Sequence, residues 1–578
     1  MHKSLPLLVS CLTGLWLSGC ASLEGSGEPT AVTAETPAST TEDTTHYADF
    51  EPEVLYLLTS AEIAAQRGRF DVTLVNYVKA ARESRDKGVI ERAMRIAQSL
   101  NGDNAQQQLA DLWLQVDPDS LQAHRVSAIQ AVKRNELKLA LEHMETIMTL
   151  GGDADFDSLA ALAGNLAPSQ QEELLSLYQE MNQRHPGTPE LEYSTALLMK
   201  VTGSPEQALE RLEPLLESDP DFLPAIILKG DLLYLTGRER EATSYLMTNT
   251  RRFPDSRQMG TLYARMLISE GELQAAQDEF ARLVELHPDT PALRLSLALV
   301  ALENGHDDLA RSELTLLAEQ SQHPNEANYY LGRIEDEAGN TDQAIEFYRN
   351  VNQGSYFLPA LARSTALLAR EGRLDEALNT LHTLRETRSQ QAESFWLLEV
   401  NVLLDQDRQQ EALESSSAAL EQFPENVEIR YARAMLQDTL GNTEEAEKDL
   451  KQIIEEDPDN AVALNALGYI LTTRTERLPE ARQYIERALQ LDPDNPAILD
   501  SMGWVLFQEG QLQPALDYLS RAWKAFPDPE VAAHYGEALW MNGAEDEARK
   551  VWKTGLKKDS EHSILRETIE RLTGNGAR

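Results

Sequence analysis

The sequence predicts an all-α fold, a superhelical solenoid of about fifteen helix pairs. Proline recurs every 34 residues over long stretches, as at Pro186, Pro220, Pro254 and Pro288. Alanine keeps nearly the same interval further along, and no β-rich segment interrupts the pattern. A repeat of this length is typical of architectures in which each unit is a pair of antiparallel helices.

The first residues predict a lipoprotein signal peptide over 1–19. Lys3 precedes an apolar run that is too short for a membrane-spanning helix, and "LSGC" ends it at Cys20. Small residues leading into a cysteine resemble the lipobox of bacterial lipoproteins, in which the cysteine is acylated and becomes the first residue. A generic export signal with an incidental cysteine is the alternative.

The same resemblance implies a subcellular location. Ala21 follows Cys20, where aspartate is the usual signal for retention in the inner membrane, so we expect the periplasmic face of the outer membrane. Cys11 would be removed with the signal peptide and Cys20 would carry lipid, so no disulfide can form within the mature chain.

Residues 20–49 are predicted to be a lipidated cysteine followed by a disordered acidic tether. The segment is rich in Ala, Thr, Ser, Glu and Pro, lacks Lys and Arg, and shows no apolar periodicity. A flexible coil of this length spans roughly 30 Å, which would lift the body of the protein clear of the lipid headgroups.

Residues 50–188 are expected to form divergent helical repeats. Residues 120–148 place Ala128 and Ala140 where a helix pair requires small side chains. The same kind of pair, with weaker motifs, is predicted at 54–86, 87–118 and 156–185.

Residues 189–560 are predicted to form eleven repeats, each marked by one alanine near the start of its second helix. A small residue there lets two helix backbones approach where they cross, and proline two to three residues beyond the pair prevents the helix from continuing. The alanines are Ala208, Ala242, Ala276, Ala310, Ala344, Ala377, Ala412, Ala446, Ala481, Ala515 and Ala548.

Two further features complete this region. Gly230, Gly332, Gly468, Gly503 and Gly536 stand in the first helices, on the side that faces the second. "EDPDN" and "LDPDN" add Asp and Asn that cap the helix that follows. "ALNALGYIL" at 463–471, followed by Ala481, Ala488 and Pro493, resembles the tetratricopeptide consensus. Residues 561–578 are expected to be a capping helix and tail, with a polar outer face.

No motif for catalysis is present. The chain lacks H-E-x-x-H, G-x-x-x-x-G-K-[ST] and G-x-S-x-G, and it lacks a cysteine pair for zinc. We therefore predict no enzyme activity, no cofactor, no metal and no small-molecule substrate. A net charge of −43 argues against nucleic acid, since phosphate contacts require basic patches, and favours basic partner surfaces.

The concave side of such a stack is lined by first-helix side chains, and aromatic ones there are the usual anchors of protein recognition. Packing between adjacent repeats is the alternative role. Asn465 and Asp500 are polar neighbours of this row. The predicted partner-binding residues are Tyr431, Tyr469, Trp504, Phe507 and Trp540, with Tyr234 and Tyr329 in matching places upstream.

A basic clamp for a C-terminal carboxylate is missing from this surface. Asn401 occupies one matching place, but Leu397 and Asp405 stand where basic residues are needed. A receptor for chaperone tails is therefore not expected.

A lipobox, an acidic tether and tetratricopeptide repeats over most of the chain resemble the outer-membrane lipoprotein adaptors of carboxy-terminal processing proteases, the LbcA/NlpI type, and most closely the larger LbcA type. The resemblance implies binding of a periplasmic protease and delivery of protein substrates, notably peptidoglycan hydrolases. An assembly or pilotin lipoprotein for an outer-membrane or secretin complex is the alternative, although such lipoproteins are generally shorter.

Overall fold

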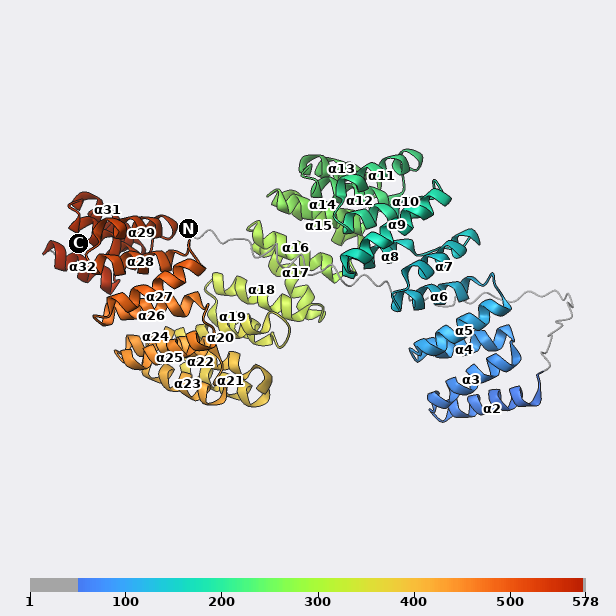
Figure 1. The fold of residues 1–578 in the computed structure, drawn as a ribbon, viewed down its shortest axis with the longest axis horizontal. Coiled ribbons are helices and arrows are strands. Elements are labelled where there is room, and N and C mark those ends of the chain that lie inside the picture. The colour runs from blue at the N-terminus through green and yellow to red at the C-terminus, as the bar shows by residue number, and fades with distance from the viewer. Residues whose placement is uncertain (1–49, 575–578) are drawn as a thin grey trace. The chain divides into compact units, whose positions relative to one another are not determined.

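A computed structural model describes residues 50–574, which are helical throughout, with no strand among them. Figure 1 shows helices following one another as antiparallel hairpins joined by short turns. The all-α solenoid prediction is confirmed for this part of the chain. The predicted signal peptide, Cys20 and tether lie outside the described residues.

The chain divides into two compact units, with the boundary after Glu313, inside α17 (Asp307–Glu319). The sequence showed no sign of this division. The remaining helices of the first unit are α2 (Pro52–Gln66), α3 (Phe70–Ser84), α4 (Lys87–Ser99), α5 (Asp103–Val116), α6 (Leu121–Lys133), α7 (Leu137–Thr149), α8 (Phe156–Leu162), α9 (Pro168–Arg184), α10 (Pro189–Val201), α11 (Pro205–Ser218), α12 (Leu223–Leu235), α13 (Glu239–Arg252), α14 (Arg257–Ser269), α15 (Leu273–Leu286) and α16 (Pro291–Glu303), with a 3-10 turn, η1, at Ala163–Asn165.

The second unit continues the pattern and ends on an unpaired helix. Its helices are α18 (Pro324–Glu337), α19 (Thr341–Asn350), α20 (Phe357–Arg370), α21 (Leu374–Thr387), α22 (Ala392–Asp405), α23 (Gln409–Gln422), α24 (Val427–Thr439), α25 (Thr443–Glu456), α26 (Ala461–Arg474), α27 (Leu478–Leu491), α28 (Pro496–Gln508), α29 (Leu512–Ala525), α30 (Pro529–Met541), α31 (Glu545–Lys558) and α32 (Ser563–Thr573), with a 3-10 turn, η2, at Ser389–Gln391.

The helix pairs fall where the sequence places them. Eleven pairs run from α10 to α31, and four more precede them from α2 to α9. All eleven marker alanines are fully buried, because each lies where its helix crosses the first helix of its pair. The prolines follow directly on the second helices, as Pro458 does after α25 and Pro493 after α27.

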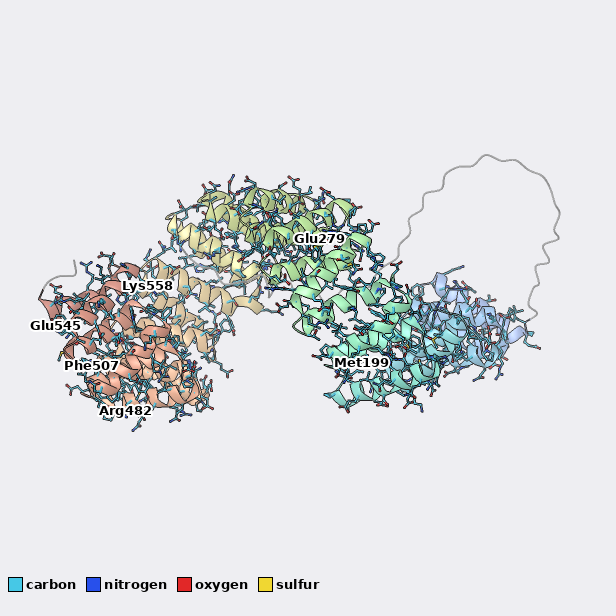
Figure 2. The ribbon with its side chains drawn as sticks, turned by 90° about the horizontal axis from the view of Figure 1, so that it is seen from above. Met199, Glu279, Arg482, Phe507, Glu545 and Lys558 are labelled. Carbon is cyan, nitrogen blue, oxygen red and sulfur yellow. The ribbon has the colours of Figure 1, made fainter. Side chains whose placement is uncertain are left out.

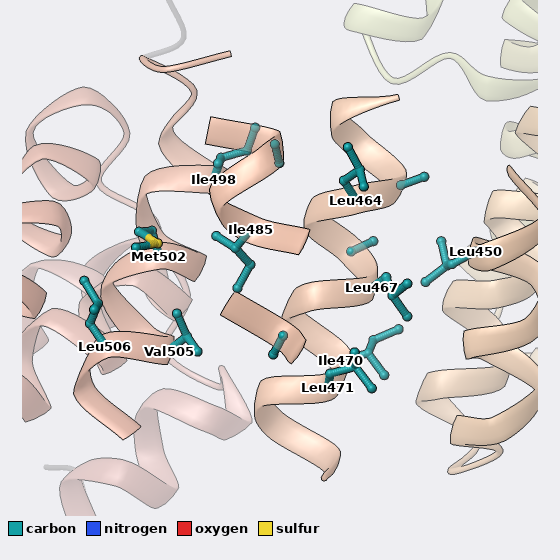
Figure 3. Packing of buried hydrophobic residues seen from close by; sticks show 14 of the residues in the cluster. Leu450, Leu464, Leu467, Ile470, Leu471, Ile485, Ile498, Met502, Val505 and Leu506 are labelled. Carbon is teal, nitrogen blue, oxygen red and sulfur yellow. The ribbon is translucent and has the colours of Figure 1, made fainter. Parts of the chain in front are cut away.

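The core is a succession of local clusters, as expected of a structure in which each pair packs mainly on its neighbours. The largest cluster in the second unit joins α24 through α30, and Figure 3 shows part of it. There Leu464 and Leu467 of α26 face Ile485 of α27 and Leu450 of α25. First helices therefore pack both on their own second helix and on the second helix of the preceding pair.

The last described helix, α32, packs on the last pair. Leu565 and Ile569 of α32 are buried against the last pair, whereas Glu567 and Glu570 are exposed. No helix between residues 50 and 574 combines the length and apolar character needed to cross a membrane.

Candidate partner-binding surface

Three of the predicted aromatic residues come together on adjacent first helices of the second unit. Tyr469 lies on α26, Trp504 and Phe507 lie on α28, and His534 of α30 joins them. We call these four residues the aromatic cluster. Phe507 is labelled in Figure 2, among the C-terminal helices.

The rings of the cluster are ordered by stacking. The Trp504 ring stacks on Phe507 at a centroid distance of 5.1 Å and on His534 at 4.1 Å, with interplanar angles of 12° and 20°. Tyr469 lies 6.0 Å from His534 in a tilted arrangement. Offset and stacked rings hold one another in place, which presents their remaining faces as a rigid surface.

A hydrogen bond from Tyr469 spans two repeats. Its hydroxyl donates to the Glu530 carboxylate at the start of α30, so α26 and α30 are connected across α28. Burial, together with the Glu530 charge, raises the pKa of Tyr469 far above its usual value, so this hydroxyl remains a donor. The contact explains why Tyr469 is only partly exposed.

His534 forms a buried ion pair with Asp500, which lies one repeat earlier. The His534 Nδ1 atom lies 2.8 Å from Asp500 Oδ2, and both side chains are almost fully buried. Burial alone would lower the pKa of His534, but the Asp500 charge and hydrogen bond outweigh it, so the pKa is raised overall. The histidine is therefore stabilised in its charged form.

Two acceptor atoms beside the cluster have no hydrogen-bond partner among the described residues. They are the other Asp500 oxygen, Oδ1, and the Asn465 side-chain oxygen, both buried. Buried acceptors without a donor are unfavourable by about 1–3 kcal/mol each. Both atoms are closed to solvent, so a partner does not reach them in this arrangement.

The other two predicted partner-binding residues lie apart from this cluster. Trp540 of α30 packs 5.5 Å from Trp552 of α31, with the Arg549 guanidinium 4.9 Å above its ring. Tyr431 of α24 packs against the apolar core and is partly buried. Burial raises the pKa of its hydroxyl. The four predicted partner-binding residues between 469 and 540 therefore separate into a group of three and a single residue.

The upstream tyrosines pack between repeats. The Tyr234 hydroxyl donates to the Ser269 hydroxyl at 2.8 Å, within the first unit. Tyr329 belongs to a group of tyrosine rings with Tyr330, Tyr348 and Tyr356 at the start of the second unit. The contacts of Tyr234 and Tyr329 are those of residues that pack between adjacent repeats.

A second feature of the same unit was not predicted as a binding site. A cleft of about 260 Å³ opens across the first helices α20, α22 and α24. We call it the leucine cleft, and it is lined by Leu358, Glu393, Ser394, Leu397, Leu398, Asn426 and Glu428. Asn426 donates to Glu393 at 3.3 Å, and both charged residues of the lining are acidic.

The sequence contained a partial signal for this cleft. Leu397 stands at a place where a carboxylate clamp would need a basic residue. Glu393 and Glu428 stand 35 residues apart, which is one repeat interval. Which leucines line one cleft depends on how far successive first helices rotate, and the repeat period alone does not give that rotation. An acidic, apolar cleft suits a basic or donor-rich apolar segment.

No group of three His, Cys, Asp or Glu side chains between residues 50 and 574 is placed to hold a metal ion. The two features offer ring faces, leucine side chains and carboxylates. Such groups recognise polypeptide segments, and they define a helical-repeat protein of the kind that holds other proteins.

The family follows from comparison with known proteins: the chain belongs to the tetratricopeptide repeat proteins. Models described as tetratricopeptide repeat match residues 264–325, 397–461 and 431–496, and also 326–353 and 474–533. The chain is 39% identical over 575 residues to TPR repeat-containing protein PA4667 of Pseudomonas aeruginosa, covering 99% of this chain and 97% of that one. Repeats of this family typically act as scaffolds, and they imply that this chain is a scaffold for protein–protein interaction.

Solved structures of repeat proteins are also similar, at low TM-scores. A protein from Parabacteroides merdae gives a TM-score of 0.36 at 16% identity, over 43% of this chain and 99% of that chain. The thermophilic protein TTC0263 of Thermus thermophilus gives 0.29 at 22%, over 32% and 100%. The APC/C hetero-tetramer Cut9-Hcn1 gives 0.32 at 12%, over 90% and 96%.

Proposed function

We propose that this chain is a lipid-anchored scaffold on the periplasmic face of the outer membrane. It binds a carboxy-terminal processing protease and presents protein substrates, such as peptidoglycan hydrolases, for proteolysis. The scaffold contributes no group to bond cleavage.

The aromatic cluster is the observation that carries the proposal. It brings three partly exposed aromatic side chains, Tyr469, Trp504 and Phe507, together on adjacent first helices. A protein segment that packs an apolar or aromatic side chain against them would use them as anchors. The net charge of −43 favours a partner whose contacting surface is basic.

The leucine cleft supports a second client. It lies on α20, α22 and α24, whereas the aromatic cluster lies on α26, α28 and α30, so the two share no residue. A scaffold that holds a protease at one and a substrate at the other converts their encounter into an intramolecular event. Effective concentrations in such arrangements reach the order of millimolar, which raises the cleavage rate without any new catalytic group.

The anchor part of the proposal rests on the sequence alone. The apolar run that ends at Cys20 and the acidic segment after it support acylation and a flexible connection to the repeats. An anchored scaffold concentrates its clients at the surface where cell-wall hydrolases act.

Reconstitution tests the function. The full chain, a purified carboxy-terminal processing protease and a purified peptidoglycan hydrolase are mixed, and loss of intact hydrolase is followed on gels. We expect cleavage to be at least tenfold faster with the chain than without it, at concentrations below the millimolar effective concentration above. The chain with the hydrolase alone should cleave nothing.

Two results would overturn the proposal. One is an unchanged rate together with no co-purification of the protease. The other is mislocalisation of a secretin when the gene is deleted while hydrolase turnover stays normal, which would favour the pilotin role instead.

A further inference from the structure

The first described helix exposes an apolar stripe. Leu55, Tyr56 and Ile63 of α2 are 50%, 71% and 45% exposed, and Thr59 lies between them on the same side of the helix. At 100° per residue these four positions span one contiguous arc, opposite the arc of Val54, Ala61 and Ala64, which is buried. Helix α2 is therefore apolar on two faces, of which only one is covered.

At two of the three positions the equivalent residues in later repeats are buried by the preceding pair, whereas the position of Leu55 is exposed there too, as at Val462. Counted from the small residue at the helix crossing, Tyr56 and Ile63 of α2 correspond to Ile498 and Val505 of α28, which are 2% and 0% exposed. In α28 these side chains belong to a cluster that also contains residues of α27. Within the described residues no pair precedes α2, so the same face lacks a cover.

The other end of the stack is finished differently. A terminal repeat normally carries a polar outer face. Helix α32 exposes Glu567 and Glu570, with Ile564 as its one large apolar side chain that is exposed, at 40%. Apolar exposure also continues beyond α2, because Phe70 and Val75 of α3 are about half exposed. The uncovered face is thus a property of the N-terminal end and is not shared by both ends.

Cations gather next to the stripe, in the residues that follow α2. Residues 67–95 hold eight Lys and Arg against four Asp and Glu, a net charge of +4. Residues 50–66 hold three Glu and no Lys or Arg, so residues 50–95 together carry +1 in a chain of −43. All eight cationic side chains are exposed. Arg67 adjoins the apolar stripe at the end of α2, and Lys79 and Arg82 share the outer face of α3 with Val75.

Two segments could in principle cover the apolar stripe of α2: the chain that precedes it and a second copy of the protein. Residues 21–49 contain only Leu23, Val32 and Tyr47 as large apolar side chains, with two prolines, and cannot form a matching amphipathic helix. A second copy meeting α2 to α2 would bury three side chains per chain, well short of the area of about 800 Å² per partner that a stable dimer needs. Neither cover accounts for the excess of cations.

We infer that the N-terminal end of the solenoid, through the apolar stripe of α2 and the cations of Arg67 and α3, docks on an anionic phospholipid surface. The inference rests on the proposed function, because the lipid anchor at Cys20 is what holds α2 close to the bilayer. A tether of 29 residues after Cys20 spans roughly 30 Å, so α2 can reach the lipid surface. Apolar side chains enter the headgroup boundary, Tyr56 keeps its hydroxyl there, and the cations pair with lipid phosphates. The acidic remainder of the chain stays away from the surface, so the contact is made by one end.

Vesicle binding without the acyl anchor tests this contact separately from the proposed function. The chain from residue 20 onward with Cys20→Ser keeps every described helix and core residue. Its co-sedimentation is measured with phosphatidylethanolamine vesicles containing about one-fifth phosphatidylglycerol. We expect binding that the combined substitutions Leu55→Gln, Tyr56→Gln and Ile63→Gln weaken about tenfold or more, and that salt also weakens.

The matched control substitutes exposed apolar residues of other helices. Ile129→Gln, Val462→Gln and Met541→Gln change side chains that are 55%, 57% and 59% exposed, and they should leave vesicle binding unchanged. Circular dichroism checks that both triple variants stay helical. Absence of vesicle binding by the Cys20→Ser chain, or an equal loss in the control, would overturn the inference. So would concentration-dependent self-association that the α2 substitutions abolish, since the cover would then be a second copy.

Failure of the anchor would look different. If native Cys20 is never acylated but the Cys20→Ser chain still binds vesicles, the proposed anchor is wrong and the α2 contact stands. If native Cys20 is acylated but the Cys20→Ser chain does not bind vesicles, the α2 contact is wrong and the anchor stands.

Discussion

At the scale of single residues, the helix crossings tolerate almost no added volume. A Cβ on Gly468 would lie 2.9 Å from the Ala481 carbonyl oxygen and against the Ile485 side chain. The backbone atom cannot move aside as a flexible side chain would. Small residues recur at these places because two backbones meet there.

Gly468→Ala should therefore destabilise the second unit by about 1–3 kcal/mol, through overpacking at the crossing of α26 and α27. The measurement is the shift in the unfolding transition followed by circular dichroism. Gly164→Ala is the matched control, because its new Cβ would meet nothing closer than Val201 at 3.6 Å. A destabilisation by the control as large as that by Gly468→Ala would contradict the explanation.

The His534–Asp500 pair predicts a dependence of stability on pH. The folded pKa of His534 is raised above its ordinary value of about 6.5, so folding favours the protonated ring. The resulting stabilisation is fully present below that ordinary value and is lost as pH rises through the folded pKa. We expect amide-exchange protection of α28 and α30, corrected for intrinsic exchange rates, to fall as pH rises above about 6.5.

His534→Gln provides the control, since it keeps a hydrogen-bonding side chain but cannot titrate. Its protection should be lower than that of the wild type at pH 6 and should change little with pH. A wild-type profile that is flat over this range would show that His534 is not charged in the fold.

The sequence predicted the small residues well and the aromatic contacts only in part. A buried alanine is dictated by the repeat interval, so all eleven could be placed from the sequence. The separation of Trp540 from the aromatic cluster could not, because it depends on Trp552 and Arg549 of a second helix. His534 and Asp500 lie 34 residues apart, which was the available signal for their pairing.

At the scale of helices, the sequence identifies side chains that cap helix N-termini. The Asn460 oxygen accepts from the Ala463 amide at 3.0 Å, and Asn495 accepts from the Ala497 amide at 3.1 Å. The asparagine of each "DPDN" motif thus caps the helix that follows, as expected. Asp457 instead accepts from the Asp459 amide within the turn, so it shapes the loop.

Asn460→Ala should destabilise α26 by about 1 kcal/mol, because one amide at the helix start loses its acceptor. Asn442 also stands at a helix start but makes no side-chain cap bond, so Asn442→Ala should cost much less. Thermal unfolding of both variants, with amide exchange at the first turns of α25 and α26, distinguishes them. Equal effects would mean that the asparagine acts through the turn and not through the cap.

At the scale of the whole molecule, the proposed anchor determines where every other surface operates. Cys20→Ala should leave the protein unprocessed or absent from the outer-membrane fraction, because the sulfur that would accept lipid is missing. Fractionation followed by mass spectrometry of the N-terminus measures this. Recovery of a mature Cys20→Ala chain in the outer membrane would contradict the lipobox reading while leaving the repeat fold untouched.

Client capture by the second unit is the last expectation. Alanine substitution of Tyr469, Trp504 and Trp540 together should weaken capture of one client, with each true anchor contributing about 2 kcal/mol or more. The contacts refine this: Tyr469 and Trp504 belong to one cluster and should affect the same client, whereas Trp540→Ala alone should have a smaller effect. Pull-downs of protease and hydrolase with each variant measure the losses.

Loss of packing has to be separated from loss of recognition, because Trp504 supports its neighbours by stacking. Circular dichroism of each variant makes that separation, since only a variant that stays helical reports on recognition. Leu397→Glu in the leucine cleft should impair the other client and spare the first. If folded variants at both surfaces still capture protease and hydrolase at full strength, the binding face lies elsewhere, and the repeats at 54–185 become the next to test.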